Sequence, residues 1–144
     1  MSAKARVFID TNVLVYLLSP DERKAGIAAE LLTAPRTTRL ISTQVLGEFV
    51  QTVRRKIGLD WSEVRNYVDV LQESCFVAPI GSEDLDLAFA IAESRGFQWY
   101  DSLIVAAAIR ADAQVLYTED LQDRQRIDAL TIINPFRSGA AAGR

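Results

Sequence analysis

Acidic residues stand just after two apolar stretches of the 144-residue chain. Asp10 directly follows residues 7–9, and Asp120 comes three positions after the stretch 114–117. If both stretches are parallel strands, their carboxyl ends meet at one edge of the sheet and bring the two acids together. Carboxylates about 4 Å apart repel by roughly 4 kcal/mol at an effective dielectric of 20, so a cleft that gathers several requires protonation or a cation. Oxygen ligands favour Mg²⁺ or Mn²⁺, which would support hydrolysis at a phosphate.

Two further acids have positions that allow either a metal-binding or a structural role. Asp101 precedes the apolar stretch 103–111, where an aspartate also serves as a helix N-cap. Glu48 lies on a predicted helix over 44–57, about 60° outside its apolar arc, where the pattern favours a solvated charge over a metal ligand. Asp10 itself could cap the helix that follows it. The pattern alone therefore leaves both interpretations open for each of these acids.

The absence of histidine limits the chemistry further. It excludes Ser-His-Asp and Cys-His nucleophilic machinery and histidine-ligated zinc. Cys75 is the single cysteine and lies in the apolar run 75–78, which favours a place in the core and allows no disulfide within the chain. Any chemistry must therefore use carboxylates, hydroxyls or a hard metal ion.

Alternating apolar stretches and amphipathic helices must position these acids. Strands are expected at residues 7–9, 40–42, 75–80, 114–117 and 131–133, and helices at 13–18, 21–32, 44–57, from 62 onward, 82–95 and 103–111. Residues 97–100 are expected to form a loop, with Asp101 opening the helix after it, and 121–127 a polar turn or short helix. Pro79 places the third strand at a sheet edge. The alternation predicts an α/β fold with a parallel sheet of about five strands flanked by helices.

The chain is expected to form one domain over residues 1–136, followed by a disordered tail over 137–144. No apolar run approaches the roughly 20 residues of a membrane span, and the N-terminus has no apolar leader before the first strand. We therefore expect a cytoplasmic protein that does not associate with membranes.

Four segments together resemble PIN domains, and specifically the VapC-type toxins of prokaryotic toxin–antitoxin pairs. They are Phe8-Ile9-Asp10-Thr11-Asn12-Val13-Leu14-Val15-Tyr16, Ser42-Thr43-Gln44-Val45-Leu46-Gly47-Glu48-Phe49, Tyr100-Asp101-Ser102-Leu103-Ile104-Val105-Ala106-Ala107-Ala108 and Leu116-Tyr117-Thr118-Glu119-Asp120-Leu121. They occur in the family's order, and the resemblance extends from about residue 6 to Phe136. All four segments in register form a specific signature.

The resemblance implies a Mg²⁺- or Mn²⁺-dependent endoribonuclease. It implies a metal site lined by four catalytic acids, Asp10, Glu48, Asp101 and Asp120. It also implies a homodimer, whose interface would use apolar side chains of the middle helices such as Trp61 or Tyr67. The family further implies a cognate antitoxin protein that occupies the cleft, and RNA as the substrate.

Around the acids, the resemblance gives supporting roles to smaller polar residues. Thr11 and Asn12 would order the first acid, and Thr118 would support the last. Asp123 is an alternative to Asp120 as the fourth acid, because a spacing of three helical positions would bring it near. Glu119 is expected to be a solvated neighbour of these acids.

Basic and aromatic residues give candidates for contacts with RNA. Arg54, Arg55 and Lys56 at the end of the predicted helix could contact phosphates, although cations also suit a helix's carboxyl end. Trp99 and Tyr100 could stack on a base, or pack under the loop. The formal net charge of −3 is compatible with nucleic acid if the four acids are neutralised by metal.

Three other classes of protein share parts of this pattern. A haloacid-dehalogenase-like phosphatase needs a second aspartate where this chain has Asn12, and a downstream lysine. A receiver domain also needs a lysine near its last strand, but the lysines are only Lys4, Lys24 and Lys56. A catalytically silent binding module, whose acids only cap helices, is the third alternative, and metal titration distinguishes it because caps need no cation.

Overall fold

A six-stranded sheet with strand order β3-β2-β1-β4-β6-β5 forms the centre of the computed structural model, which describes residues 4–137. In chain order, its elements are β1 (Ala5–Ile9), α1 (Thr11–Val15), the 3₁₀ turn η1 (Tyr16–Leu18), α2 (Glu22–Thr33), β2 (Thr37–Ser42), α3 (Thr43–Thr52), the π-helical turn η2 (Val53–Ile57), α4 (Trp61–Ser74), β3 (Phe76–Ala78), α5 (Ser82–Arg95), α6 (Trp99–Arg110), β4 (Val115–Tyr117), β5 (Arg126–Ile127) and β6 (Leu130–Ile133). The tail predicted over 137–144 falls outside the described residues except for Arg137.

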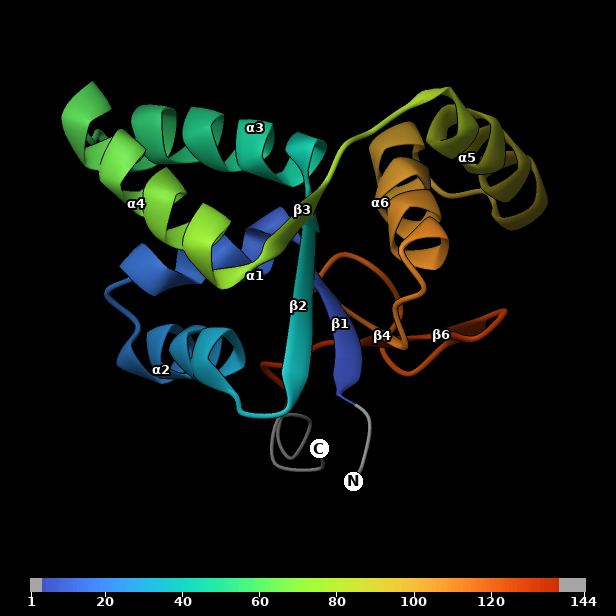
Figure 1. Cartoon of the computed structure of the whole chain (residues 1–144), viewed down its shortest axis with the longest axis horizontal. Helices are drawn as coiled ribbons and strands as arrows, with labels where there is room; N and C mark the ends of the chain where they lie inside the picture. Colours follow the sequence, from blue (N-terminus) through green and yellow to red (C-terminus); the bar gives the residue numbers. More distant parts are fainter. Residues whose placement is uncertain (1–3, 138–144) are drawn as a thin grey trace.

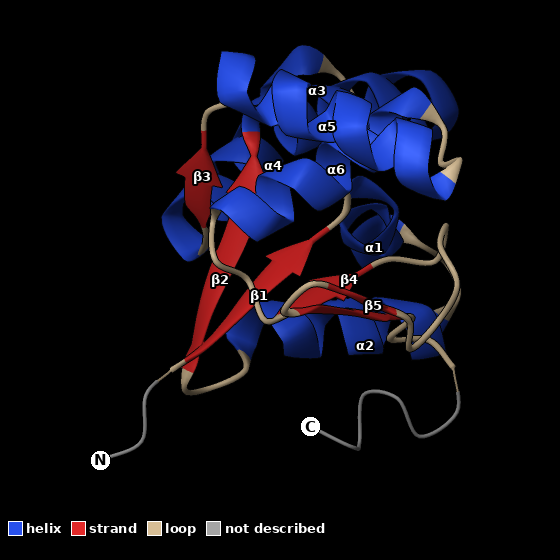
Figure 2. Ribbon diagram, turned by 90° about the vertical axis from the view of Figure 1, so that its right-hand side faces the viewer, coloured by secondary structure: helices blue, strands red, loops and turns tan. Residues whose placement is uncertain are grey.

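Helices cover the sheet in separate groups. Figure 1 shows α3 beside α4 at the upper left and α5 beside α6 at the upper right of the view. Figure 2 shows α2 at the bottom of the molecule, with strands between it and α3 and α5 at the top. This arrangement of helices around a mostly parallel sheet confirms the predicted fold class.

The core is built from the apolar runs that the strands and helices present to one another. Its largest fully buried side chains are Phe8, Phe49, Ile9, Leu14, Leu40, Ile41, Leu71, Leu116, Leu130, Ile132, Val13 and Val45. The central strands β1 and β4 are apolar on both faces because helices cover both. Cys75 is buried as expected, and burial raises the pKa of its thiol to about 11, so it stays an unreactive thiol.

The pairing of the two central strands brings distant segments to one edge. Phe8 lies opposite Leu116, and Ile9 lies opposite Tyr117, in parallel register. The amide of Asp10 continues this ladder by donating to the carbonyl of Tyr117 at 3.0 Å. The chain segments after β1 and β4 therefore begin side by side, as the sequence predicted.

The start of α6 differs from the prediction. Residues 97–100 were expected to form a loop opening into a helix at Asp101, but α6 begins at Trp99, with Gln98 as its N-cap. Trp99 packs against Phe89 of α5, with ring centroids 4.8 Å apart, and this contact anchors the first helical turn. Asp101 consequently lies within the first turn, where its charge suits the helix dipole, and it is not the cap.

The last part of the sheet also departs from the prediction. Residues 126–127 form β5, which pairs antiparallel with β6, so the sheet has five parallel strands and one short antiparallel strand at its edge. At the opposite edge lies β3, as Pro79 indicated. Ser42 caps α3 by accepting a hydrogen bond from the amide of Val45 at 3.2 Å.

Candidate active site

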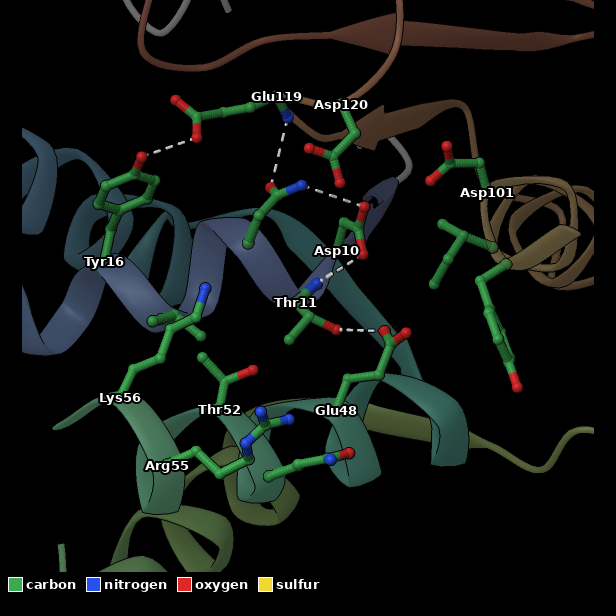
Figure 3. A pocket seen from close by; sticks show the side chains of 15 residues that line it. Asp10, Thr11, Tyr16, Glu48, Thr52, Arg55, Lys56, Asp101, Glu119 and Asp120 are labelled. Atoms are coloured by element: carbon green, nitrogen blue, oxygen red, sulfur yellow. Dashed lines mark hydrogen bonds between the residues drawn. The ribbon is translucent and has the colours of Figure 1, made fainter. Parts of the chain in front are cut away.

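A cleft of about 710 Å³ opens where β1, α1, α3, η2, α6 and the segment after β4 meet (Figure 3). It is lined by Asp10, Thr11, Asn12, Val15, Tyr16, Glu48, Gln51, Thr52, Arg55, Lys56, Tyr100, Asp101, Ile104, Glu119 and Asp120. All four acids predicted to form the metal site are among these residues. The fold therefore brings together side chains that come from four separate segments of the chain.

Asp10 is the most deeply buried of these acids, with 6% of its surface exposed. Its Oδ1 accepts a hydrogen bond from the amide of Thr11 at 2.7 Å, so Asp10 does cap α1. Its Oδ2 accepts from the hydroxyl of Thr118 at 2.9 Å and from the amide group of Asn12 at 3.3 Å. The two interpretations of Asp10 are thus compatible, because one oxygen caps the helix while the carboxylate as a whole lines the cleft.

Burial raises the pKa of Asp10 from 3.8 to about 7. The hydrogen bonds from Thr118 and Thr11 oppose this shift, because they favour the charged form, while the nearby charges of Asp120 and Glu48 add to it. A carboxylate in this position is costly to ionise without a cation. The cleft therefore has the property expected of a site that attracts positive charge.

Asp101 reaches the cleft from α6, and its pKa is shifted by the same kinds of cause. Partial burial raises its pKa above the usual value, and the charges of Asp120 and Glu48 raise it further. Figure 3 shows the carboxylate groups of Asp101 and Asp120 on the side of the cleft where Asp10 lies. The acids are thus electrostatically coupled, although they come from different elements.

Glu48 reaches the cleft from α3 because its side chain lies beside the buried face of that helix. Its Oε1 accepts a hydrogen bond from the hydroxyl of Thr11 at 2.8 Å, and its Oε2 accepts from the side-chain amide of Gln44 at 3.3 Å. The simple alternative of a solvated charge at the edge of the helix does not describe Glu48. Thr11 links the first acid to this one, since its amide binds Asp10 and its hydroxyl binds Glu48.

Thr118 and Asn12 connect the segment after β4 to Asp10. The hydroxyl of Thr118, which is fully buried, also accepts hydrogen bonds from the side-chain amide of Asn12 and from the amide of Asp120, both at 3.1 Å. The side-chain oxygen of Asn12 accepts from the amide of Glu119 at 3.3 Å. These bonds fix Asp120 relative to Asp10.

Asp123 lies elsewhere. Its Oδ1 accepts a hydrogen bond from the amide of Asn134 at 2.7 Å, and its Oδ2 is 3.8 Å from guanidinium nitrogens of both Arg124 and Arg137. It does not line the cleft, because 121–127 forms turns and a strand rather than the helix that would have brought it back toward Asp120. Of the two candidates for the fourth acid, Asp120 is the one at the cleft.

The basic residues separate into two groups. Arg55 and Lys56 line the cleft at the end opposite Asp101, as Figure 3 shows. Arg54 lies away from it: its guanidinium stacks on the ring of Trp61 at 4.5 Å and donates to the carbonyl of Leu59 at 2.9 Å. The π-helical turn η2, which ends at Gly58 in the left-handed conformation, carries all three residues.

Of the two aromatic candidates, Tyr100 is the one at the cleft. It is 63% exposed and lines the rim, whereas Trp99 is half-buried against Phe89. Trp99 is therefore occupied with packing on α5, and Tyr100 has a ring face available to a ligand.

The sequence pattern did not indicate that Glu119, beside the acids, would contact Lys24 and Tyr16. Glu119 was expected to be solvated, but its side chain forms an ion pair with Lys24 at 3.1 Å and accepts a hydrogen bond from Tyr16 at 2.7 Å. Lys24 and Glu119 are 95 residues apart. Neither spacing nor periodicity relates two positions so distant in the chain.

The donor set fits a hard divalent cation. Residues 4–137 contain no group of three or more carboxylate or thiol side chains already arranged to hold an ion. Mg²⁺ does not require such a cage, because it usually keeps several waters and binds through one or two carboxylates. The buried Asp10, with Asp101, Asp120 and Glu48 around it, supplies oxygen ligands of this kind, whereas zinc would favour the thiolates and imidazoles that the cleft lacks.

Residues 7–129 match the model of the PIN domain family. The chain therefore belongs to the PIN domain family, which confirms the family predicted from the sequence. No curated protein matches the chain in sequence.

Solved structures of VapC and VapBC proteins share this fold. VapBC-1 from nontypeable Haemophilus influenzae matches with a TM-score of 0.68 at 19% identity, covering 92% of this chain and 99% of that one. A toxin–antitoxin complex from Klebsiella pneumoniae matches with a TM-score of 0.67 at 20% identity, covering 93% and 98%. VapC20 from Mycobacterium tuberculosis, a toxin that cleaves the sarcin–ricin loop, matches with a TM-score of 0.65 at 19% identity, covering 79% and 89%. The predicted likeness to VapC toxins is thus confirmed for the fold.

None of the helices within residues 4–137 is both long and apolar enough to cross a lipid bilayer.

Proposed function

We propose that the protein is a divalent-metal-dependent endoribonuclease and the toxin component of a type II toxin–antitoxin pair, acting in the cytoplasm. The observation that carries the proposal is the convergence of Asp10, Glu48, Asp101 and Asp120 on one cleft of a PIN domain. The fold shared with VapC and VapBC proteins supports the toxin assignment.

Asp10, with Asp101, Asp120 and Glu48, would hold Mg²⁺ or Mn²⁺ in the cleft. A bound divalent ion would supply an activated water and neutralise charge on a phosphate undergoing displacement. Thr118 and Asn12 keep Asp10 oriented through hydrogen bonds, and Thr11 does the same for both Asp10 and Glu48. The burial of Asp10 keeps bulk water from screening its charge.

Arg55 and Lys56 would bind phosphates of the RNA to one side of the reacting bond. Both lie in the same cleft as the acids, so an RNA backbone that enters it passes cations at one end and carboxylates at the other. The exposed ring of Tyr100 is suited to stacking on an unpaired base. Arg54 and Trp99 do not line the cleft, because Arg54 stacks on Trp61 and Trp99 packs against Phe89.

Two protein partners belong to the proposal. The first is a cognate antitoxin that covers the acidic cleft; the matched structures include toxin–antitoxin complexes. The second is another copy of this chain, through the exposed side chains of Trp61 and Tyr67 on α4, which are 63% and 38% exposed.

Cleavage of total RNA with and without Mg²⁺, with mapping of the ends produced, tests the proposed activity. Asp10→Asn keeps the shape of the side chain but removes a ligand charge, so cleavage is expected to fall by at least a hundredfold, on the order of the loss of one electrostatic catalytic group. The matched control is Glu30→Gln on the exposed face of α2, which should cleave like the wild type. Undiminished cleavage by Asp10→Asn would overturn the assignment, and absence of metal binding would favour a silent binding module.

A further inference from the structure

Glu119 lines the cleft, but its carboxylate turns away from the four acids. Its Oε1 accepts a hydrogen bond from the phenol of Tyr16 at 2.7 Å, and its Oε2 accepts from the ammonium group of Lys24 at 3.1 Å. Figure 3 shows Glu119 extended toward Tyr16, while the next residue, Asp120, points toward Asp10. The charge of Glu119 is therefore paired within the protein and is not one of the candidate metal ligands.

Lys24 is fixed from several sides. Its ammonium group donates to the phenol oxygen of Tyr16 at 3.1 Å and lies 4.4 Å from the centroid of that ring. It also lies 5.3 Å from the ring centroid of Phe136, which packs edge-on against Tyr16 at 4.6 Å. Tyr16, Lys24 and Glu119, which we call the Lys24 cluster, thus form a closed set of mutual contacts backed by Phe136.

The Lys24 cluster holds the segment 118–120, which carries Thr118 and Asp120 of the acidic site. Within residues 118–120, the hydroxyl of Thr118 binds both Asp10 and the amide of Asp120. The amide of Glu119 donates to Asn12, and its side chain is held by the Lys24 cluster. Glu119, the residue between Thr118 and Asp120, is thereby anchored through both its backbone and its side chain, so the backbone that leads into Asp120 is held in place.

We propose that Lys24 and Tyr16 are positioning residues, which hold Glu119 so that Asp120 faces Asp10 and thereby raise the affinity of the cleft for a divalent cation. This inference rests on the proposed function, in which the cleft binds such a cation. Outer groups that orient metal ligands typically change metal affinity by about 10- to 100-fold when they are removed. The carboxylate of Glu119 is paired with Lys24 and Tyr16 rather than being one of the four acids that would hold the cation, so the effect of the Lys24 cluster is on ligand orientation.

The test removes the ion pair without changing the net charge of the protein. Lys24→Met combined with Glu119→Gln is titrated with Mn²⁺ by calorimetry, alongside the wild type. If the Lys24 cluster orients Asp120, the double variant should bind Mn²⁺ at least about tenfold more weakly than the wild type. The Mn²⁺ concentration for half-maximal RNA cleavage should rise by the same factor, while the rate at saturating Mn²⁺ stays near that of the wild type.

Two further variants separate orientation from general stability. Tyr16→Phe keeps the ring that packs on Phe136 and removes the hydrogen bonds of the phenol to Glu119 and Lys24, while the Lys24–Glu119 ion pair remains. It should therefore lose Mn²⁺ affinity to an intermediate extent. Arg65→Met with Asp69→Asn removes an exposed ion pair of 3.0 Å on α4 and should leave Mn²⁺ affinity unchanged. The α4 variant thus shows what the loss of an ion pair remote from the cleft does, for comparison with the loss of the Lys24–Glu119 ion pair beside it.

Wild-type Mn²⁺ affinity in the Lys24→Met/Glu119→Gln variant would overturn the inference, even if that variant melts at a lower temperature. In that case the ion pair would serve stability alone, and the proposed function would be unaffected. If the wild type itself binds no Mn²⁺, both this inference and the proposed metal-dependent function are overturned.

Discussion

The hydroxyl of Thr118 donates a 2.9 Å hydrogen bond to Oδ2 of Asp10, across 108 residues of sequence. This bond opposes the effect of burial, which raises the pKa of Asp10, and the net pKa is about 7. The balance between burial and this hydrogen bond sets the pH at which Asp10 carries the charge that a cation needs.

Thr118→Val should therefore move that pH upward. Valine has nearly the same shape but no donor, and a hydrogen bond to a charged group contributes about 1.5–3 kcal/mol, which corresponds to at least about one pKa unit. The pH at which metal-dependent cleavage reaches half its maximum should rise by about one unit. Thr33→Val on α2, whose hydroxyl donates only to the carbonyl of Ala29, serves as the control. An unshifted pH profile in Thr118→Val would argue against this role for the hydroxyl.

The raised pKa of Asp10 also predicts how stability depends on pH without metal. Between about pH 4 and pH 7 the folded protein holds a proton that the unfolded chain has released, so this group's contribution is full below pH 3.8 and is lost as pH rises to about 7. The shift from 3.8 to about 7 corresponds to a loss on the order of 4 kcal/mol. Urea unfolding at pH 5 and pH 8 should show about 3 kcal/mol of this loss, because only the part between pH 5 and about pH 7 falls within that range. Asp10→Asn serves as the reference that lacks the titrating group. If the free energies of unfolding of the wild type and Asp10→Asn differ by the same amount at both pH values, the prediction is contradicted.

Replacement of two acids should reveal the repulsion directly. At pH 8, Asp10→Asn combined with Asp101→Asn removes two charges that burial and neighbouring acids disfavour, so the metal-free protein should become more stable. The amide oxygen can still cap α1 at position 10, which limits the loss. Thermal melting should also show that Mg²⁺ no longer stabilises the variant, whereas the wild type gains about 2.7 kcal/mol at a hundredfold excess over Kd. A marked loss of metal-free stability would instead identify the two aspartates as structural groups.

The basic end of the cleft gives a prediction with a matched control on the same turn. Arg55→Ala and Lys56→Ala should each weaken RNA binding and reduce the slope of log K against log salt by about one, because each removes a phosphate contact. The matched control is Arg54→Ala, which removes the same charge one residue away. The guanidinium of Arg54 is stacked on Trp61, so this variant should change the salt slope less than the other two. Binding should be measured with the Asp10→Asn protein, so that the RNA stays intact. Equal salt slopes for all three variants would show that only overall charge matters.

The sequence identified the parts of this protein that depend on local pattern. The apolar strand before Asp10, the helix ended by Gly58 and the edge strand before Pro79 are all signalled by residues within or next to the element. The family motifs brought Glu48 and Asp101 to attention, although helix periodicity alone favoured a solvated charge and a cap. Motif and topology together placed the acids near one edge of the sheet.

The parts that the sequence did not reveal depend on contacts between distant residues. The start of α6 at Trp99 follows from packing on Phe89, which no local signal in residues 97–100 reports. The strand β5 has two residues, too few to show any periodicity. Its pairing with β6, together with the bond from Asn134 to Asp123, takes Asp123 out of the site. Tertiary structure overrode local preference in each case.

The two edges of the sheet have a consequence for self-association. One edge is β3, with three residues, and the other is β5, with two residues in the antiparallel direction. Such short edges offer few free backbone groups to a foreign strand, and Pro79 removes one more donor beside β3. The described part of the chain is therefore protected against growth into continuous, amyloid-like sheets.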